Sequence, residues 1–334
     1  MGADQSRPIR LSPRLTHRLR CPRCRSSLSG DLEALSCTRE SCGLTFGSVG
    51  GVPCLFDEAV SLFSLELAAQ SARAKAQESS LRAHVDRILP TLDGNVSGVG
   101  NLESLKQRLF RLNARPVILN VGDKHPSAPS LALRRHPDVE TVELDVRPSA
   151  MTNVLSDPMC LPFEDATFDC VIAIAVLEHI VDPVACVAEF ERVLKPGGLV
   201  YSDVPFMLEV HAGAFDYMRY TGVGHRNLFR DFEELDSGVT QGPGVALSHS
   251  LQSFFLSFVE QNFARFAVKA ACRVTLFWLR YFDLYLGKLP GAKDCSLGTY
   301  FVGRKDGRRR TPREILDAYG GITPDLFLGR NPEA

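Results

Sequence analysis

The chain has 334 residues, of which 45% are hydrophobic and 23% are charged, and its formal net charge is −1. This length accommodates one large domain and a small one, and the composition is ordinary for a soluble globular protein. The near-zero charge gives no general indication of nucleic-acid or membrane binding, and no run of about 18 uncharged apolar residues predicts a membrane-spanning helix.

The chain begins with a basic segment, because seven arginines fall between Arg7 and Arg25. We expect residues 1–15 to form a solvated basic tail, and an organellar targeting segment is the alternative. The segment lacks the apolar core of a secretory signal, so the sequence predicts a cytoplasmic protein.

Two cysteine pairs follow, Cys21 with Cys24 and Cys37 with Cys42, and twelve residues separate the pairs. A hairpin of this length would bring the four thiolates together, as tetrahedral zinc requires. Residues 16–56 are therefore predicted to form a zinc ribbon that takes much of its folding energy from the metal. An incidental cluster, or a site that has lost its metal, is the alternative.

The segment resembles zinc-ribbon domains that accompany methyltransferases, in which a C-P-x-C knuckle and a second cysteine pair precede a strand of the type G-I-P-x-L. Here that strand is "GVPCL", from Gly51 to Leu55, so Cys54 is expected to be buried rather than a ligand. The resemblance covers about 40 residues.

Residues 57–115 are rich in Ala, Leu, Glu, Arg and Gln, with apolar residues at helical spacing. We expect a helical connector that packs on the next domain and ends before Pro116.

Strands and helices then alternate between residues 116 and 305. Apolar runs such as "VILNV", "ETVELDV", "FDCVIAIAV" and "LVYSDVPF" alternate with helix-like segments such as "PSLALRRH" and "DPVACVAEFERVLKPGG". The second helix is expected to begin at an Asp182 cap and to end at Gly197. This alternation predicts an α/β fold, a mostly parallel sheet with helices on both faces.

Ligands in such folds bind beyond the carboxyl ends of the strands, where Gly122, Asp145, Asp157 and Glu178 fall. Gly122 would let the backbone approach a ligand, and Asp145 is placed to accept both hydroxyls of a ribose. Asp157 could accept a hydrogen bond from an adenine amino group. Met159 and Leu161 would line the ring.

The segment from "LSDPMCLPFEDATFD" through "LEHI" to "LKPGGLVYSDVPF" closely resembles class I S-adenosylmethionine-dependent methyltransferases of the type 11-like group. The resemblance runs from Val117 to about Phe206 and implies a Rossmann-like fold with a seven-stranded, mostly parallel sheet. It assigns Asp145 to the ribose and Asp157 to the adenine of the cofactor. Residues 175–179, among them Ala175 and Glu178, would line the site of methyl transfer.

The first motif departs from that family, in which an acid is followed by glycines at alternate positions. Here Asn120 replaces the acid, Gly122 keeps the first glycine, and Lys124 and Pro126 replace the next two. Either the loop is a tolerated variant in an active enzyme, or cofactor binding is weak or lost and the chain is a scaffold.

The segment after the fifth strand is polar and aromatic and is expected to bind the acceptor. Methylating a hydroxyl requires removal of a proton, so His211 is predicted to be the base, with His179 and His225 as the next candidates. No metal is expected at this site. A lid held by its own polar contacts is the alternative.

Three further residues of this segment, Asp216, Tyr217 and Arg219, are predicted to bind the substrate; the guanidinium of Arg219 would hold a phosphate or carboxylate. The pattern "PFMLEVHAGAFDYMRYT" resembles a methyltransferase subgroup associated with glycan modification. That resemblance implies a hydroxyl of a glycan or of a lipid-linked sugar as the acceptor.

A helical insertion is expected at about residues 245–290, and a surface tail at 306–334. Within residues 251–286, ten aromatics accompany a stripe of cations at helical spacing, formed by Arg265, Lys269, Arg273 and Arg280. Such a helix can lie in a membrane interface. The preferred interpretation is a helical layer over the sheet or a contact between two copies.

The leading prediction is therefore a zinc-containing, S-adenosylmethionine-dependent methyltransferase that acts on a glycan or another small molecule. An RNA methyltransferase is one alternative, since the arginine-rich start could contact phosphates, although nucleic acid is the less favoured partner. The other alternative is a non-catalytic scaffold.

Overall fold

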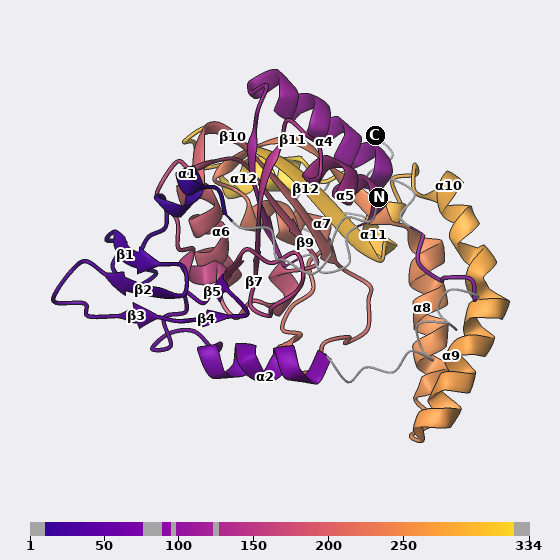
Figure 1. Cartoon of the computed structure of the whole chain (residues 1–334). Coiled ribbons are helices and arrows are strands. Elements are labelled where there is room, and N and C mark those ends of the chain that lie inside the picture. Colours follow the sequence, from indigo (N-terminus) through magenta and orange to yellow (C-terminus); the bar gives the residue numbers. More distant parts are fainter. Residues whose placement is uncertain (1–10, 76–88, 95–97, 123–126, 324–334) are drawn as a thin grey trace.

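The computed structural model describes residues 11–75, 89–94, 98–122 and 127–323 (Figure 1). Its centre is a seven-stranded sheet in the order β11-β12-β10-β9-β6-β7-β8. In chain order the strands are β6 Val117–Val121, β7 Glu140–Asp145, β8 Val154–Leu155, β9 Phe168–Ile174, β10 Leu194–Pro205, β11 Phe232–Gln241 and β12 Gly298–Lys305. The predicted α/β alternation is thus present.

The sheet is parallel apart from one strand. β6 pairs in parallel with β7 and β9, and β9 with β10, whereas β12 lies antiparallel between β10 and β11. From β6 the chain runs outward through β7 and β8 and then returns to β9 on the other side. This reversal creates the switch point at which open α/β sheets bind ligands.

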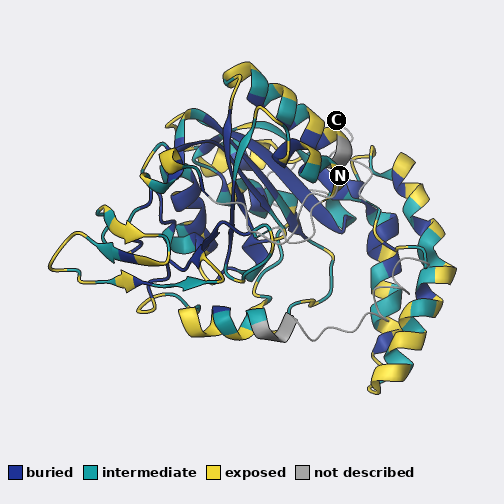
Figure 2. Cartoon of the chain, viewed as in Figure 1, coloured by how far each residue is buried: buried dark blue, intermediate teal, exposed yellow. Residues whose placement is uncertain are grey.

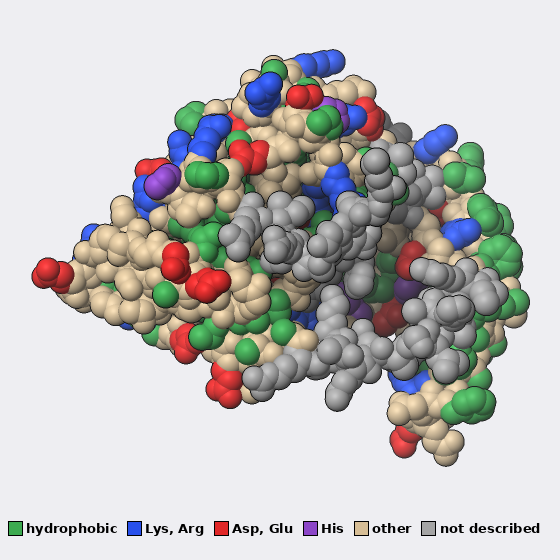
Figure 3. All heavy atoms as spheres, viewed as in Figure 1, with side chains coloured by type: hydrophobic (Ala, Val, Ile, Leu, Met, Phe, Trp, Pro, Cys, Tyr) green, Lys and Arg blue, Asp and Glu red, His purple; other side chains and the backbone are tan. Residues whose placement is uncertain are grey.

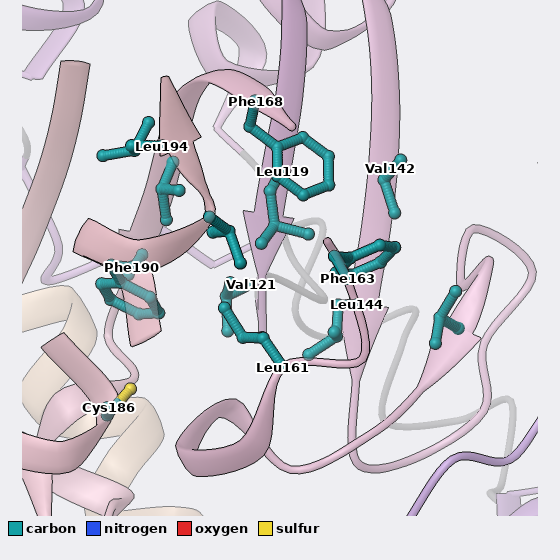
Figure 4. Close-up of a cluster of buried hydrophobic side chains, with 14 of the residues drawn as sticks. Leu119, Val121, Val142, Leu144, Leu161, Phe163, Phe168, Cys186, Phe190 and Leu194 are labelled. Atoms are coloured by element: carbon teal, nitrogen blue, oxygen red, sulfur yellow. The ribbon is translucent and has the colours of Figure 1, made fainter. Parts of the chain in front are cut away.

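Side chains of β6 show how the sheet divides the core. Leu119 and Val121 point into a cluster with Phe190 of α6 (Pro183–Val193), as Figure 4 shows, whereas Ile118 packs on the opposite face. There it shares a second cluster with Leu105 of α4 (Gly98–Leu112), which packs beside α5 (Ala128–Arg134). Because both faces are covered, the central strands β6 and β9 are buried along almost their whole length, as Figure 2 shows.

Helix α6 begins as predicted, since the Asp182 side chain accepts a hydrogen bond from the backbone N–H of Ala185 at 3.0 Å. The predicted end at Gly197 is wrong. The helix ends at Val193 because Leu194 already pairs with Phe168, so the "LKPGG" turn belongs to the start of β10.

The N-terminal cysteine segment forms a small antiparallel sheet of β1 (Leu28–Asp31), β2 (Ala34–Cys37) and β3 (Thr45–Phe46), followed by β4 (Ser48–Val49) and β5 (Val52–Pro53). It is preceded by α1 (Pro13–Thr16). Leu11 and Leu15 are buried in the main core, so the part of the expected tail that the structure describes is packed rather than solvated.

This segment is joined to the large sheet. Leu19 forms a β-bridge with Phe163, and Cys54 forms one with Leu155 in β8. Leu19, Cys21 and Phe46 share one apolar core with β6 and β7, and Cys54 is buried as expected. The N-terminal segment therefore extends the main body instead of standing apart from it.

Within the expected connector, residues 57–63 form an irregular strap that leads to α2 (Leu65–Lys75). After the sheet's fifth strand come α7 (Gly222–Leu228) and, beyond β11, a projecting pair of helices, α8 (Pro243–Leu256) and α9 (Asn262–Leu276) (Figure 1). The remaining helices are η1 Pro158–Cys160, η2 Leu177–His179, η3 Gly213–Phe215, η4 Phe277–Phe282, α10 Asp283–Leu286, α11 Ala292–Cys295 and α12 Pro312–Asp317.

The cation stripe of α9 and η4 binds the loop at 89–94. The guanidinium of Arg273 donates to the carbonyls of Leu89 and Pro90, and that of Arg280 donates to the carbonyls of Thr91 and Asp93. The contacts with this loop use Arg273 and Arg280 within the chain, but the α8–α9 pair projects from the sheet instead of forming the expected layer over it (Figure 1). Among the described residues, no helix is both long and apolar enough to cross a membrane.

The C-terminal segment is partly packed. Ile315 of α12 is buried, and the backbone N–H of Arg310 donates to the carbonyl of Arg230 at 2.7 Å. The expected surface tail therefore holds a docked helix within the residues that the structure describes.

Candidate functional site

Gly122 lies directly after β6, at the switch point of the sheet, with a φ of +72°. A Cβ at this position would lie only 2.7 Å from Cγ2 of Val176, which is itself buried. Glycine is thus required both by the backbone and by the close approach of the turn after β9. The predicted Lys124 and Pro126 replacements lie outside the described residues.

Asn120, at the position of the family's acid, is almost fully buried. Its Nδ2 donates to Oε2 of Glu143 at 2.9 Å, and Glu143 also pairs with the buried Arg134. Asn120 Oδ1 has no hydrogen-bond partner in the described part of the chain, so this oxygen at the strand end can accept a hydrogen bond from a ligand. Apart from opposite charges on neighbouring elements, no sequence signal indicates the Arg134–Glu143 pair.

Both predicted nucleotide-binding acids lie at the same edge of the sheet. Asp145, at the end of β7, is 8% exposed and accepts from the backbone N–H of Arg147 at 2.9 Å. Asp157 caps η1 by accepting from the N–H of Met159 at 2.9 Å, and it also accepts from the hydroxyl of Ser61 at 2.6 Å. Leu161 is in the core, and Met159 is half-buried.

Ser61 belongs to the strap, so a segment predicted to be a plain connector reaches the candidate cofactor site. In the same strap, the ring of Phe63 stacks on that of Phe215 in η3, with centroids 6.0 Å apart. The strap therefore links Asp157 to the segment after β10.

Glu178 lies in the 3-10 turn η2 that follows β9, just after Ala175, which has a φ of +52°. The Glu178 side chain is fully buried, and burial raises its pKa to about 8. Neither carboxylate oxygen has a hydrogen-bond partner among the residues that the structure describes. An unpaired buried acid at a strand end is typical of functional sites.

His179 and His211 meet beside this carboxylate, although 32 positions separate them in the chain. Their Nε2 atoms are 3.2 Å apart, and they lie 3.8 Å and 3.9 Å from Oε1 of Glu178. The side chains are 27% and 34% exposed, so one side of the cluster is open. Figure 3 shows histidine and acidic side chains in the recess between the sheet and the α8–α9 pair.

The opposite nitrogen of each ring is anchored. Nδ1 of His179 lies 2.7 Å from the carbonyl oxygen of Phe215, and Nδ1 of His211 lies 3.3 Å from Oδ2 of Asp216. Because a carbonyl oxygen can only accept, the Phe215 carbonyl favours a proton on Nδ1 of His179, which leaves Nε2 of that ring as an acceptor. Burial lowers the pKa of His179, which favours its neutral form.

Arg219 and Asp216 hold the segment that carries His211. The guanidinium of Arg219 donates to both oxygens of Asp216 and to the carbonyls of Leu208, Glu209 and Met218. This hydrogen-bonded ion pair holds the pKa of Asp216 well below its usual range. All five donors of Arg219 are in use, so its geometry favours positioning the loop over binding a substrate anion.

Tyr217 and His225 are placed differently. Tyr217 is 42% exposed, and its backbone N–H donates to the carbonyl of Glu178 at 2.8 Å. His225 is 1% exposed, hydrogen-bonded to Ser202 and Thr299, and burial lowers its pKa to about 3. It does not join the His179–His211 cluster, and its setting is that of a core histidine.

The four predicted cysteine ligands do converge. Sγ of Cys21 lies 3.8 Å from that of Cys42, Sγ of Cys24 lies 3.4 Å from that of Cys37, and all four sulfurs are within 4.8 Å of one another. The structure thus brings these four residues together in one group, the four-cysteine cluster.

Comparison with known proteins gives a family for the central segment. Residues 126–202 match the family model described as a methyltransferase domain, which is less than a quarter of the chain. The chain is 54% identical over 44 residues to cycloartenol-C-24-methyltransferase 1 of Oryza sativa subsp. japonica, covering 13% of each protein. It is 58% identical over 40 residues to an uncharacterized methyltransferase of Schizosaccharomyces pombe, covering 12% of this chain and 14% of that protein.

The chain thus spans less than a fifth of the length of the curated relatives it matches. Among solved structures, phosphoethanolamine N-methyltransferase 2 of Haemonchus contortus is similar with a TM-score of 0.36 and 17% identity, over 69% of this chain and 60% of that one. Residues 126–202 are thus similar to a methyltransferase domain, and the strand order is that of a Rossmann-like fold.

Proposed function

We propose that the protein is an S-adenosylmethionine-dependent methyltransferase. The observation that carries the proposal is the placement of Gly122 and Asp145 at adjacent carboxyl-terminal strand ends, with Asp145 inside the segment that matches the family and Gly122 just before it. Gly122 leaves no room for a Cβ, Asn120 Oδ1 is an unpartnered acceptor in the described chain, and Asp145 is an acid at the ribose position. These residues fit an adenosine-containing ligand with an α-amino group.

In this proposal Asp145 binds the ribose hydroxyls, Asp157 binds the adenine and Asn120 Oδ1 faces the amino group. The bound cofactor supplies a methyl group on a sulfonium, which an acceptor oxygen can attack in line. The acceptor lies at the open side of the His179–His211 pair, and Nε2 of His211 takes its proton. The Phe215 carbonyl and Asp216 fix the two rings for that task.

For the acceptor we propose a glycan hydroxyl. The support is the polar segment that carries His211 and the exposed Tyr217, together with its resemblance to glycan-modifying enzymes. The support for the RNA alternative is reduced, because three arginines in the described part of the basic start pair within the chain: Arg20 with Glu164, Arg23 with Asp57 and Arg25 with Glu189.

We further propose that the four-cysteine cluster holds a structural zinc ion. Zinc–sulfur bonds of about 2.3 Å in a tetrahedron place sulfurs about 3.8 Å apart. The sulfur–sulfur separations of 3.4 Å and 3.8 Å fit this arrangement. Because Cys21 is part of the main core, the ion would stabilise the whole domain.

The test is methyl transfer from S-adenosylmethionine carrying a tritiated methyl group. The full chain is incubated separately with polyhydroxylated glycans and with RNA. We expect label in the glycans, greatly reduced by His211→Gln and retained by His136→Gln, a histidine outside the site. Label in RNA alone would support the RNA alternative, and cofactor binding without transfer to either pool would contradict the proposed acceptor.

A further inference from the structure

The side chains of Glu178, His179 and His211 meet at the end of β9, and each brings an atom that can bind a cation. Both oxygens of Glu178 lack a hydrogen-bond partner in the described ranges, and the Nε2 atoms of His179 and His211 face each other at 3.2 Å. A proton or a cation between the buried carboxyl group and the two facing ring nitrogens would satisfy all three side chains.

We propose that Glu178, His179 and His211 form a binding site for a divalent transition-metal ion such as Zn²⁺, separate from the four-cysteine cluster. Two imidazoles and one carboxylate are a known ligand set for such ions, whereas Mg²⁺ and Ca²⁺ prefer oxygen ligands alone. The ligand atoms of the three residues lie within 4.8 Å of one another.

The distances between the ligand atoms of Glu178, His179 and His211 are close to those in a metal-bound site. Ligands about 2.1 Å from an ion, at angles of about 90–109°, are about 3.0–3.4 Å apart. The Nε2–Nε2 distance of 3.2 Å already agrees, and the 3.8 Å and 3.9 Å distances to Glu178 require a shift of about half an ångström. A rotation of the Glu178 carboxylate would provide that shift.

The surroundings match the outer shell of a metal site. Metal-binding histidines usually donate their second N–H to a carbonyl or carboxylate, which sets the tautomer and the ring orientation. Here His179 has the Phe215 carbonyl and His211 has Asp216, which Arg219 holds in turn. The partial exposure of both rings leaves open coordination positions, as in catalytic rather than structural sites.

An ion at this place would lie where the proposed acceptor binds, so its open positions would take an oxygen of the acceptor. It would also occupy Nε2 of His211, so the base role proposed above applies to the metal-free site. The binding site itself does not depend on methyl transfer, and its test needs neither cofactor nor acceptor.

The experiment is a zinc titration of the full chain, with bound metal counted by mass spectrometry after removal of free ions. We expect two equivalents per chain in the wild type and in His136→Gln, and one in Glu178→Gln and His211→Gln, with affinity for the second ion lowered about 100-fold or more. A parallel titration with Co²⁺ should show thiolate-to-cobalt absorption that saturates with the first equivalent and does not grow with the second.

If the folded wild type bound only one equivalent of zinc, all of it at thiolates, the proposal would be overturned. A proton shared between the two imidazole rings would then explain their close approach. A second equivalent retained by both Glu178→Gln and His211→Gln would also overturn it, because the ion would then lie elsewhere. Circular dichroism of each variant establishes that it is folded. The number of zinc ions bound by the wild type tests the proposal even if a variant does not fold.

Discussion

Replacing Gly122 with alanine perturbs the candidate cofactor site through one methyl group. A non-glycine residue in the left-handed region costs about 1–2 kcal/mol. The added Cβ would meet Cγ2 of Val176 at 2.7 Å, and moving that buried side chain costs about 1 kcal/mol more. We therefore expect Gly122→Ala to lower the free energy of unfolding by about 2–3 kcal/mol.

For 334 residues, the entropy of unfolding at the midpoint is roughly 0.7 kcal/mol per degree, so the expected fall in Tm is about 3–4 °C. The assay is thermal unfolding by circular dichroism, with calorimetric titration of S-adenosylmethionine to show that affinity falls as well. Gly122→Ala combined with Val176→Ala should recover the part of the affinity that the clash removes.

The matched control is Gly100→Ala, in helix α4, where an added Cβ meets no atom within 4 Å. It should raise stability by up to about 1 kcal/mol through helix propensity, without affecting the cofactor. If Gly122→Ala melted within a degree of the wild type and bound the cofactor equally well, the close approach of the two turns would be refuted.

Three further predictions concern charge, the strap and zinc. Burial alone would lower the pKa of His249, but its interactions with Asp93 and Glu209 raise that pKa to about 9. These interactions therefore stabilise the folded protein fully below pH 6.5, and this contribution is lost as the pH rises through 9. The difference in unfolding free energy between the wild type and His249→Gln, measured in urea, should shrink by about 2 kcal/mol from pH 6 to 10, a value reduced because Asp93 is exposed. A difference that does not change with pH would contradict this. Ser61→Ala should cost about 1–2 kcal/mol in thermal unfolding, yet tighten cofactor binding severalfold by freeing an oxygen of Asp157, whereas weaker binding would show that the strap forms part of the site. Chelation of zinc should lower the midpoint temperature of one calorimetric transition that includes the whole domain. A separate transition at lower temperature would show that the segment with the four-cysteine cluster is not part of the common core.

The alternation of the sheet could be predicted because apolar runs and helix caps are local signals. The "VILNV" run became β6, and Asp182 caps α6 as expected. The end of that helix was misplaced because strand pairing of Leu194 with Phe168 is a tertiary effect that competes with helix propensity.

The candidate site was predicted only in part, for a related reason. Glu178 and His179 stand together in the sequence, and His211 follows the next parallel strand, so strand-end geometry could have indicated their convergence. The roles of Ser61 and Arg219 had no such signal. Their partners depend on how a strap and a loop fold back, which no local pattern records.

The most direct test of the account is calorimetric titration of S-adenosylmethionine into the zinc-loaded wild type and Asp145→Ala. Two ribose hydroxyl bonds to a carboxylate, at about 1.5 kcal/mol each, predict a loss of about 150-fold in affinity from a micromolar Kd. Absence of binding by the folded wild type at millimolar cofactor would contradict the methyltransferase proposal and favour the scaffold.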